Sequence, residues 1–380
     1  MKSFDIRTKI FFGENSLDRL SDIPYKKALI ITDPFVVKSG MLQMITIQLQ
    51  QGYTEYEIFS DVVPDPPLEK IEKGVKALLE YDPDCIITIG GGSAIDSAKA
   101  IKEFAMHSSG KNTPLIAIPT TSGTGSEVTA FAVVTDPSKD IKYPLVSDSM
   151  LPTEAILDAA LVKSVPASVT ADTGMDVLTH AIEAYVSINN NEFSAALAEK
   201  AIEICGTFLL RSYLDNHDTH ARQKMHVASC LAGLAFNSAS LGLNHGMAHA
   251  LGGKFHIPHG RSNAMLLPHI IEYNSGITIH SKSQREYPPC VRKYVNVAKL
   301  LGCSNFNEIT TVRALISWIQ FMNKEMNIPL SVSQCGINKT EYFNAIDSMA
   351  EKALADGCTK TNPKVPTKLE IVSIFEHLYE

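Results

Sequence analysis

The chain has 380 residues, of which 45% are hydrophobic, so it can bury a large core, and typical domain sizes suggest two domains. Its net charge is −7, with acidic and basic residues interspersed, which argues against a nucleic-acid partner. No run of about 18 apolar residues occurs, which predicts no membrane span. The charged start does not resemble a signal peptide, and the seven cysteines lack CxxC spacing, so we expect a cytoplasmic protein with reduced thiols.

The first half alternates short apolar runs with helical periodicity, which predicts a parallel, doubly wound sheet of the Rossmann-like type. Lys27–Thr32 (KALIIT) is typical of a strand that is buried on both faces. Residues 131–158 are less regular, and we expect a hairpin and a crossover there. The predicted strands are 27–32, 55–59, 85–89 and 114–118, and the predicted helices between them are 36–50, 68–81 and 94–106.

The second half shows almost no strand signals after residue 168, which predicts an all-α domain. We therefore expect an α/β nucleotide-binding domain over residues 1–163 and an all-helical, metal-binding catalytic domain over residues 164–380. The predicted helices of the second domain are 172–187, 193–214, 221–238, 243–255, 263–273, 287–301, 307–326, 341–355 and 367–378.

Two glycine- and hydroxyl-rich segments follow predicted strands of the first half. Residues 90–99 (GGGSAIDSAK) let backbone N–H groups approach a diphosphate at a helix N-terminus, although they are not the GxGxxG fingerprint. Residues 119–127 (PTTSGTGSE) offer further hydroxyls at the end of the next strand. The alternatives are a tight strand–helix turn for the first segment and a polar turn with a helix cap for the second. Together they favour a nucleotide-phosphate site.

Asp33 ends the first predicted strand, where its carboxylate can accept hydrogen bonds from a ribose. The same charge repels a 2′-phosphate by on the order of 4 kcal/mol at about 4 Å and an effective dielectric near 20. A dinucleotide in this pocket should therefore be NAD rather than NADP. The alternative is that Asp33 caps the following helix, since Asp-Pro is a common helix start.

A histidine-rich segment of the second half predicts a metal site. Residues 244–260 (NHGMAHALGGKFHIPHG) hold His245 and His249, which are four apart on one helix face, and His259 beyond a glycine pair. Asp176 and His180 form a second pair at the same spacing on an earlier helix. Imidazole and carboxylate are ligands for Zn²⁺ or Fe²⁺. Spacing alone favours His245 with His249 as the helical pair of ligands.

In this order and spacing, the glycine segment, the hydroxyl segment and the paired metal segments resemble the iron-containing (group III) alcohol dehydrogenases over essentially the full chain. Further segments, among them GMDVLTHAIEAYVS, LGLNHGMAHALGGKFHIPHG and ALADGCTKTNP, look most like the propanol and ethanol dehydrogenases that are encoded with propanediol- or ethanolamine-utilisation microcompartments.

The resemblance implies that the metal ligands are Asp176, His180, His245 and His259, and it leaves His249 beside the metal as a proton relay. His256 is then peripheral. Asp65 departs from the family pattern, since many members carry Asn at that position. The implied cofactor-binding residues are Asp33, Asp65, Gly91, Gly92, Ser93, Asp96, Thr120, Thr121, Thr124, Lys142 and Leu161.

The implied activity is NAD(H)-dependent interconversion of short aldehydes and primary alcohols, such as propanal and 1-propanol or acetaldehyde and ethanol, with Fe²⁺ or alternatively Zn²⁺. The implied protein is a homo-oligomer in the cytoplasm, with a microcompartment and its shell as the alternative location and partner. Alternatives within the fold are a lactaldehyde, 1,3-propanediol or glycerol-type dehydrogenase. Alternatives of another class are a dehydroquinate synthase-like lyase and a non-catalytic microcompartment-associated protein.

Overall fold

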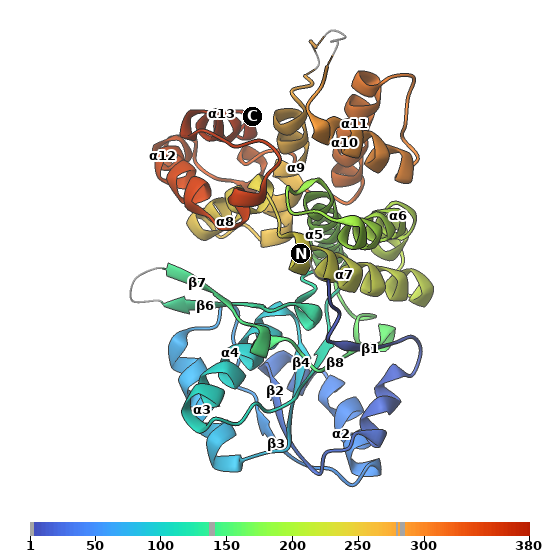
Figure 1. Ribbon diagram of the computed structural model, residues 1–380, viewed down its shortest axis with the longest axis vertical. Helices are drawn as coiled ribbons and strands as arrows, with labels where there is room; N and C mark the ends of the chain where they lie inside the picture. The colour runs from blue at the N-terminus through green and yellow to red at the C-terminus, as the bar shows by residue number, and fades with distance from the viewer. Residues whose placement is uncertain (1–3, 137–140, 279, 282–285) are drawn as a thin grey trace. The chain divides into compact units, whose positions relative to one another are not determined.

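The computed structural model describes residues 4–136, 141–278, 280–281 and 286–380. The chain divides into two compact units, Met1–Ser164 and Val165–Glu380. The first unit contains a parallel sheet with helices, and the second is built from helices (Figure 1). This confirms the predicted fold class.

The first unit is organised around a six-stranded sheet in the order β1-β8-β5-β4-β2-β3, in which every pairing is parallel. A separate antiparallel hairpin, β6–β7, accounts for the expected irregular region. The strands are β1 (Lys9–Phe12), β2 (Lys27–Thr32), β3 (Glu55–Phe59), β4 (Cys85–Gly90), β5 (Leu115–Pro119), β6 (Phe131–Asp136), β7 (Ile141–Val146) and β8 (Glu154–Leu157).

Apolar side chains cover both faces of the sheet, which explains the uninterrupted apolar runs in the sequence. In β2, Ile30 packs into a cluster with α2 and η1, whereas Leu29 and Ile31 face a second cluster with α3 and α4. The helices and 3-10 turns of this unit are η1 (Ser16–Asp22), α1 (Pro34–Lys38), α2 (Met41–Gln51), α3 (Leu68–Tyr81), α4 (Gly92–Ser109), η2 (Ser126–Val128), η3 (Asp148–Met150) and η4 (Ala159–Leu161).

Two strands and one helix break were absent from the predicted elements. β1 is an edge strand whose residues are half exposed, and β8 begins with Glu154, which pairs with Arg19 at 2.8 Å, so neither reads as an apolar run. The predicted helix 36–50 is two helices, because Gly40 adopts a left-handed conformation with φ of 85° between α1 and α2.

The second unit consists of helices packed around α5 (Ala167–Val186), almost all of whose residues are buried. Among the described residues, no single helix has the length and hydropathy of a membrane span; α7 and α8 reach it only together, across a bend of 108°. The other elements are α6 (Glu192–Leu214), α7 (Thr219–Ala239), α8 (Leu243–Phe255), α9 (His259–Ser275), α10 (Pro289–Leu300), α11 (Glu308–Glu325), η5 (Ser333–Cys335), α12 (Lys339–Ala355), η6 (Cys358–Thr361) and α13 (Lys368–Leu378).

α8 spans the predicted helix 243–255 without a break at the glycine pair 252–253, and it ends at His256 with φ of 54°. His259 is the first residue of α9 rather than part of the turn before it. The change of direction therefore takes place within residues 256–258.

Close packing of α9 on α5 depends on Gly260. A Cβ at this position would overlap the backbone carbonyl oxygen of Asp172 and lie 2.6 Å from its carbonyl carbon. The Asp172 carboxylate also holds α9 through Arg261, at 3.0 and 3.1 Å. These contacts fix the helix end that carries His259.

We predict that Gly260→Ala lowers the free energy of unfolding by about 1–3 kcal/mol, because a rigid backbone must move to admit the methyl group. Thermal unfolding followed by circular dichroism measures the effect. Gly253→Ala is the matched control: no atom lies within 4 Å of its added Cβ, so a helical alanine should leave stability unchanged or raise it by up to about 1 kcal/mol. Equal melting of wild type and Gly260→Ala would refute the packing argument.

Candidate metal centre and nucleotide-binding loops

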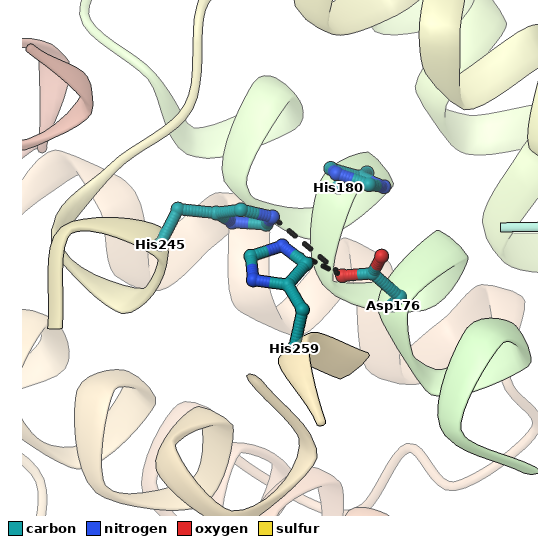
Figure 2. Close-up of side chains that lie close together, drawn as sticks. All are labelled: Asp176, His180, His245 and His259. Atoms are coloured by element: carbon teal, nitrogen blue, oxygen red, sulfur yellow. Dashed lines mark ion pairs between the residues drawn. The ribbon is translucent and has the colours of Figure 1, made fainter. Parts of the chain in front are cut away.

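Four side chains from three helices converge inside the second unit. Asp176 and His180 lie one turn apart on the same face of α5, while His245 comes from the first turn of α8 and His259 from the start of α9. One donor atom from each lies within 4.8 Å of the other three. Figure 2 shows the rings of His245 and His259 turned toward the Asp176 carboxylate. The structure thus brings together the four residues predicted as metal ligands.

The spacing of these donor atoms suits a small divalent ion. Asp176 Oδ1 lies 3.7 Å from His245 Nε2 and 3.6 Å from His259 Nε2. Ligands about 2.1 Å from a tetrahedral ion are roughly 3.4 Å from one another. Small shifts of the side chains would therefore complete the coordination, and a mixed imidazole and carboxylate set fits either Fe²⁺ or Zn²⁺.

Asn263 marks the position where possible ligand atoms of three of these residues meet. Its Nδ2 donates to Asp176 Oδ1 at 2.7 Å and lies 3.1 Å from Nε2 of both His245 and His259. Asn244 donates to Asn263 Oδ1 at 2.8 Å, which orients the amide with its nitrogen toward the cluster. An amide nitrogen has only two hydrogens and cannot satisfy three acceptors at once. Convergence of this kind is what a cation requires.

The electrostatics of the cluster keep the carboxylate ionised. Burial raises the pKa of Asp176, but the nearby rings of His180, His259 and His245 outweigh burial and leave that pKa below its ordinary value. Desolvation by the crowded side chains lowers the pKa of His259, although part of its ring remains accessible, and the neighbouring imidazoles act in the same direction against the attraction of Asp176. An anionic oxygen beside a neutral imidazole is a suitable pair of ligands for a divalent ion.

His249 belongs to a neighbouring group rather than to the four-residue cluster. Its Nδ1 lies 2.9 Å from Asp356 Oδ2, and its donor atom groups with those of Asp356 and Cys358. Its ring stacks on that of His259, with centroids 5.3 Å apart. Burial raises the pKa of the Cys358 thiol well above its usual value, so the sulfur stays protonated and is a poor ligand. His245 and His249 are thus four residues apart on α8, but His245 lies in the four-residue cluster, whereas His249 contacts Asp356. The exposed His256 caps the end of α8.

In the first unit, three loops leave neighbouring strands at the same edge of the sheet. The register aligns Thr32 with Ile89 and Gly90 with Pro119, so β2, β4 and β5 end side by side. The chain passes outward from β2 to β3 and then returns to β4 on the other side of β2. Such a reversal at the carboxyl ends of parallel strands is where open α/β sheets bind nucleotides.

The glycine-rich turn between β4 and α4 (residues 90–92, the glycine loop) packs against residues 119–127, the hydroxyl loop. Gly90 has φ of 153°, and a Cβ there would lie 3.2 Å from Asp33 Oδ2. A Cβ on Gly92 would lie 2.7 Å from the methyl carbon of Thr124, and one on Gly91 would lie 3.4 Å from Thr121 Oγ1. α4 begins at Gly92, so its first N–H groups face this loop cluster.

Asp33 and Asp96 both have structural partners. Asp33 Oδ1 accepts from the backbone N–H groups of Phe35 and Val36 at 2.8 and 3.0 Å, so the alternative reading of Asp33 as a helix cap is correct. Its Oδ2 lies toward Gly90. Asp96 accepts from Ser126 Oγ at 2.6 Å and from the Val133 N–H at 3.0 Å, which ties α4 to the hydroxyl loop.

The remaining predicted cofactor residues are distributed unevenly. Ser93 lies in the first turn of α4, and Thr120 follows β5 and donates its N–H to the Gly90 carbonyl at 2.9 Å. Asp65 sits in a left-handed conformation with φ of 49° after β3. Leu161 is fully buried and packs in the core cluster on one face of the sheet. The side chain of Lys142, in β7, lies outside the described part of the structure.

Sequence reasoning missed Asn263, Asp356 and Glu183, a buried carboxylate that contacts His245. Periodicity could have found two of them. Glu183 is seven residues after Asp176 and Asn263 is four after His259, so each lies on the ligand face of its helix. Asp356 follows α12 in a loop, and only the folded chain brings it to His249.

Comparison with known proteins agrees with both halves of this description. Residues 7–159 match the family described as iron-containing alcohol dehydrogenase, and residues 170–379 match the C-terminal part of the Fe-containing alcohol dehydrogenase family. The chain is 41% identical to 1-propanol dehydrogenase PduQ of Citrobacter freundii, over all of both proteins. It is 37% identical to an NADPH-dependent butanol dehydrogenase of Clostridium saccharobutylicum, over 100% of this chain and 98% of that protein.

Among solved structures, a 1,3-propanediol oxidoreductase superimposes with a TM-score of 0.89 at 32% identity, with full coverage of both chains. These similarities extend from the nucleotide-binding loops to the metal cluster and confirm the resemblance found in the sequence. The chain therefore belongs to the iron-containing alcohol dehydrogenase family.

Proposed function

We propose that this chain catalyses the reversible reduction of short aldehydes to primary alcohols by NADH, with a divalent metal ion, iron or alternatively zinc, held by Asp176, His180, His245 and His259. The convergence of these four donors within 4.8 Å carries the proposal. A divalent ion bound there supplies Lewis acidity toward a carbonyl oxygen. One hydride from NADH and one proton convert the aldehyde into the alcohol.

The chain's own contribution to the chemistry is delivery of that proton. His249 lies beside His259, and Asp356 accepts from its Nδ1–H, so its Nε2 is left to give or take a proton. Burial raises the pKa of Asp356, but the His249 hydrogen bond and charge bring it down to about 2. The ionised carboxylate thus fixes both the tautomer and the orientation of the ring.

The proposed nucleotide site uses backbone N–H groups for phosphate and a carboxylate for ribose. The N-terminus of α4 and the loops that carry Gly91–Ser93 and Thr120–Thr124 supply donors at three adjacent strand ends. Asp33 Oδ2, beside Gly90, is the proposed ribose acceptor, which favours NAD(H) over NADP(H). Asp96 supports this site by holding the hydroxyl loop.

Small unbranched substrates fit the names of the relatives, which act on propanol, butanol and 1,3-propanediol. Propanal and acetaldehyde are the leading candidates. The resemblance to dehydrogenases that are encoded with microcompartments supports the further proposals of a homo-oligomer, a cytoplasmic or microcompartment location, and association with a shell.

We predict that the Fe²⁺-loaded protein oxidises NADH in a one-to-one ratio with aldehyde consumed. The test is a kcat/KM panel of propanal, acetaldehyde, lactaldehyde and 3-hydroxypropanal, each with NADH and NADPH, followed by absorbance under anaerobic conditions. We expect NADH to be preferred by roughly tenfold or more, because Asp33 repels a 2′-phosphate. Absence of turnover with all four aldehydes would overturn the proposed activity; a preference for NADPH would overturn only the role of Asp33.

We predict that His259→Ala removes the metal ion and the activity together. His259 is the most exposed of the four ligands, with 42% of its side chain accessible, so the substitution should least disturb the core. Metal content is measured by inductively coupled plasma mass spectrometry after gel filtration. His256→Asn is the control, because Asn tolerates the left-handed backbone at that exposed position. Full metal content in His259→Ala would exclude His259 as a ligand.

We predict that His249→Ala lowers kcat by roughly 10²- to 10⁴-fold while metal content stays at the wild-type level. Asp356→Asn should give a smaller loss, because the amide keeps an acceptor for His249 but loses the charge. Steady-state kinetics and metal analysis on the same preparations separate the two effects. Loss of metal from His249→Ala would make His249 a ligand instead of a relay.

A further inference from the structure

Glu183 is a buried acid that lies behind His245, outside the set of four ligands. It stands on α5, two helical turns after Asp176 and one turn after His180, and it is 3% exposed. An isolated carboxylate in such a place costs several kcal/mol of desolvation free energy unless hydrogen bonds offset it. Its partners therefore indicate why it is there.

The Glu183 carboxylate accepts hydrogen bonds from the start of α8. Oε1 accepts from the Asn244 backbone N–H at 2.7 Å, and Oε2 accepts from the His245 backbone N–H at 3.3 Å. Oε2 also lies 2.5 Å from His245 Nδ1. A Cβ at position 242 would lie only 2.7 Å from Oε1, so Gly242 lets the helix start approach the carboxylate.

This arrangement determines which nitrogen of His245 can bind a cation. A carboxylate accepts but cannot donate, so Nδ1 must carry the proton in the short contact with Oε2. When the ring is neutral, as binding of a cation requires, its lone pair is therefore on Nε2, which faces Asp176 and Asn263. A carboxylate on the far nitrogen of a ligand histidine also raises the electron density of the ring and strengthens its bond to a metal.

The same carboxylate joins the two halves of the ligand set. Asp176 and His180 belong to α5, whereas His245 belongs to α8, and these helices approach the cluster from different directions. Because Glu183 is covalently part of α5 and accepts the first free N–H groups of α8, it fixes the position of His245 relative to the α5 pair.

We propose that Glu183 is a positioning residue for the metal: its carboxylate selects the Nε2-binding tautomer of His245 and aligns α8 with the α5 ligands. The inference depends on the metal site of the proposed function. It adds a third functional residue to the segment 176–183, in which Asp176 and His180 bind and Glu183 orients.

Glu183→Gln tests the tautomer directly. If the amide nitrogen faces His245, it donates to Nδ1 and moves the ring proton to Nε2, where it blocks the metal. If the amide oxygen faces His245, the amide nitrogen meets the Asn244 N–H, and two donors oppose each other. Either orientation should weaken metal binding roughly 10- to 100-fold. Glu183→Asp keeps the charge on a shorter side chain and should recover part of the affinity.

The control is Glu199→Gln in the same unit. Glu199 Oε1 accepts from Tyr185 Oη at 2.6 Å and from the Asn296 amide at 2.9 Å, so the substitution also perturbs a hydrogen-bonded carboxylate. These two partners, Tyr185 and Asn296, are not among the proposed ligands. We therefore expect wild-type metal affinity in this variant even where its metal-free melting temperature falls.

The measurements are Co²⁺ and Fe²⁺ affinity by chelator competition, the visible absorption of the Co²⁺-loaded protein, and melting of each metal-free variant. Weakened affinity with an altered Co²⁺ spectrum in Glu183→Gln, partial recovery in Glu183→Asp and neither change in Glu199→Gln support the proposal. Wild-type affinity and spectrum in Glu183→Gln overturn it.

If Glu183→Gln does not fold, Glu183→Asp decides: wild-type affinity there would overturn the proposal, and reduced affinity with a normal metal-free melt would support it. Failure of the wild-type protein to bind either metal would instead overturn the metal site itself.

Discussion

The packing of the helical unit is constrained by one group: an ionised carboxylate, which lies among three imidazoles in its interior and must be stabilised there. Asp176 is almost fully buried, and removal of such a charge from water costs several kcal/mol unless partners replace the lost hydration. Asn263 donates to it, and the surrounding rings keep its pKa low. An apolar cluster would pack in this space without that cost. Asp176 is instead an ionised acid with several close neighbours, at the place where α5, α8 and α9 meet. A bound cation would explain why a charged group stands there.

The side chains that contact Asp176 and its neighbours are held in turn by other side chains and by close packing of the helix backbones. Asn263 and Glu183 hold the ligands, Asn244 orients Asn263, and the Arg261–Asp172 pair with Gly260 brings the start of α9 against α5. The two helix starts that carry His245 and His259 are both fixed to α5 by an acid on α5, Glu183 for one and Asp172 for the other. Ligand geometry in this unit is thus a consequence of how two helix N-termini dock on a third helix.

The first unit uses a buried cation in a comparable structural role. Lys99 is fully buried in α4 and donates to Ser126 Oγ, Thr129 Oγ1 and the Phe131 carbonyl, at 2.8–3.0 Å. Burial lowers the pKa of Lys99 to about 8, although Asp96 and Glu127 act against the shift. Because three acceptors use all the N–H donors of the ammonium group, Lys99 holds the end of the hydroxyl loop in place and is not available to a phosphate. The loop's backbone and hydroxyl groups are left for a ligand.

Sequence reasoning reached the fold class and named the four side chains that converge in the helical unit, for different physical reasons. Strands such as β2 and β4 are buried on both faces, so their apolar runs are diagnostic, whereas β1 and β8 are partly exposed or charged and carried no such signal. The i, i+4 pair Asp176 and His180 follows from helix geometry alone. Helix spacing paired His245 with His249 incorrectly, because the two rings lie at 72° to each other and His249 turns to Asp356. The partner of a side chain depends on tertiary structure, so only the resemblance or the folded chain could choose His259.

Cofactor preference depends on the charge of single residues near the cofactor, so percentage identity to a relative does not predict it. One relative, 37% identical over nearly its whole length, is described as NADPH-dependent, yet we expect the Asp33 carboxylate of this chain to favour NADH. The Asp33 carboxylate caps α1 through Oδ1, and serine or threonine could cap that helix equally well. The fold therefore does not require a charge at this position. A single charge opposite a 2′-phosphate changes the relative binding free energy of the two dinucleotides by on the order of 4 kcal/mol, which is enough to reverse preference between two proteins that share every helix and strand. On the proposed placement of Asp33, we expect cofactor choice in this chain to follow from the residue at the end of β2 rather than from its percentage identity to any relative.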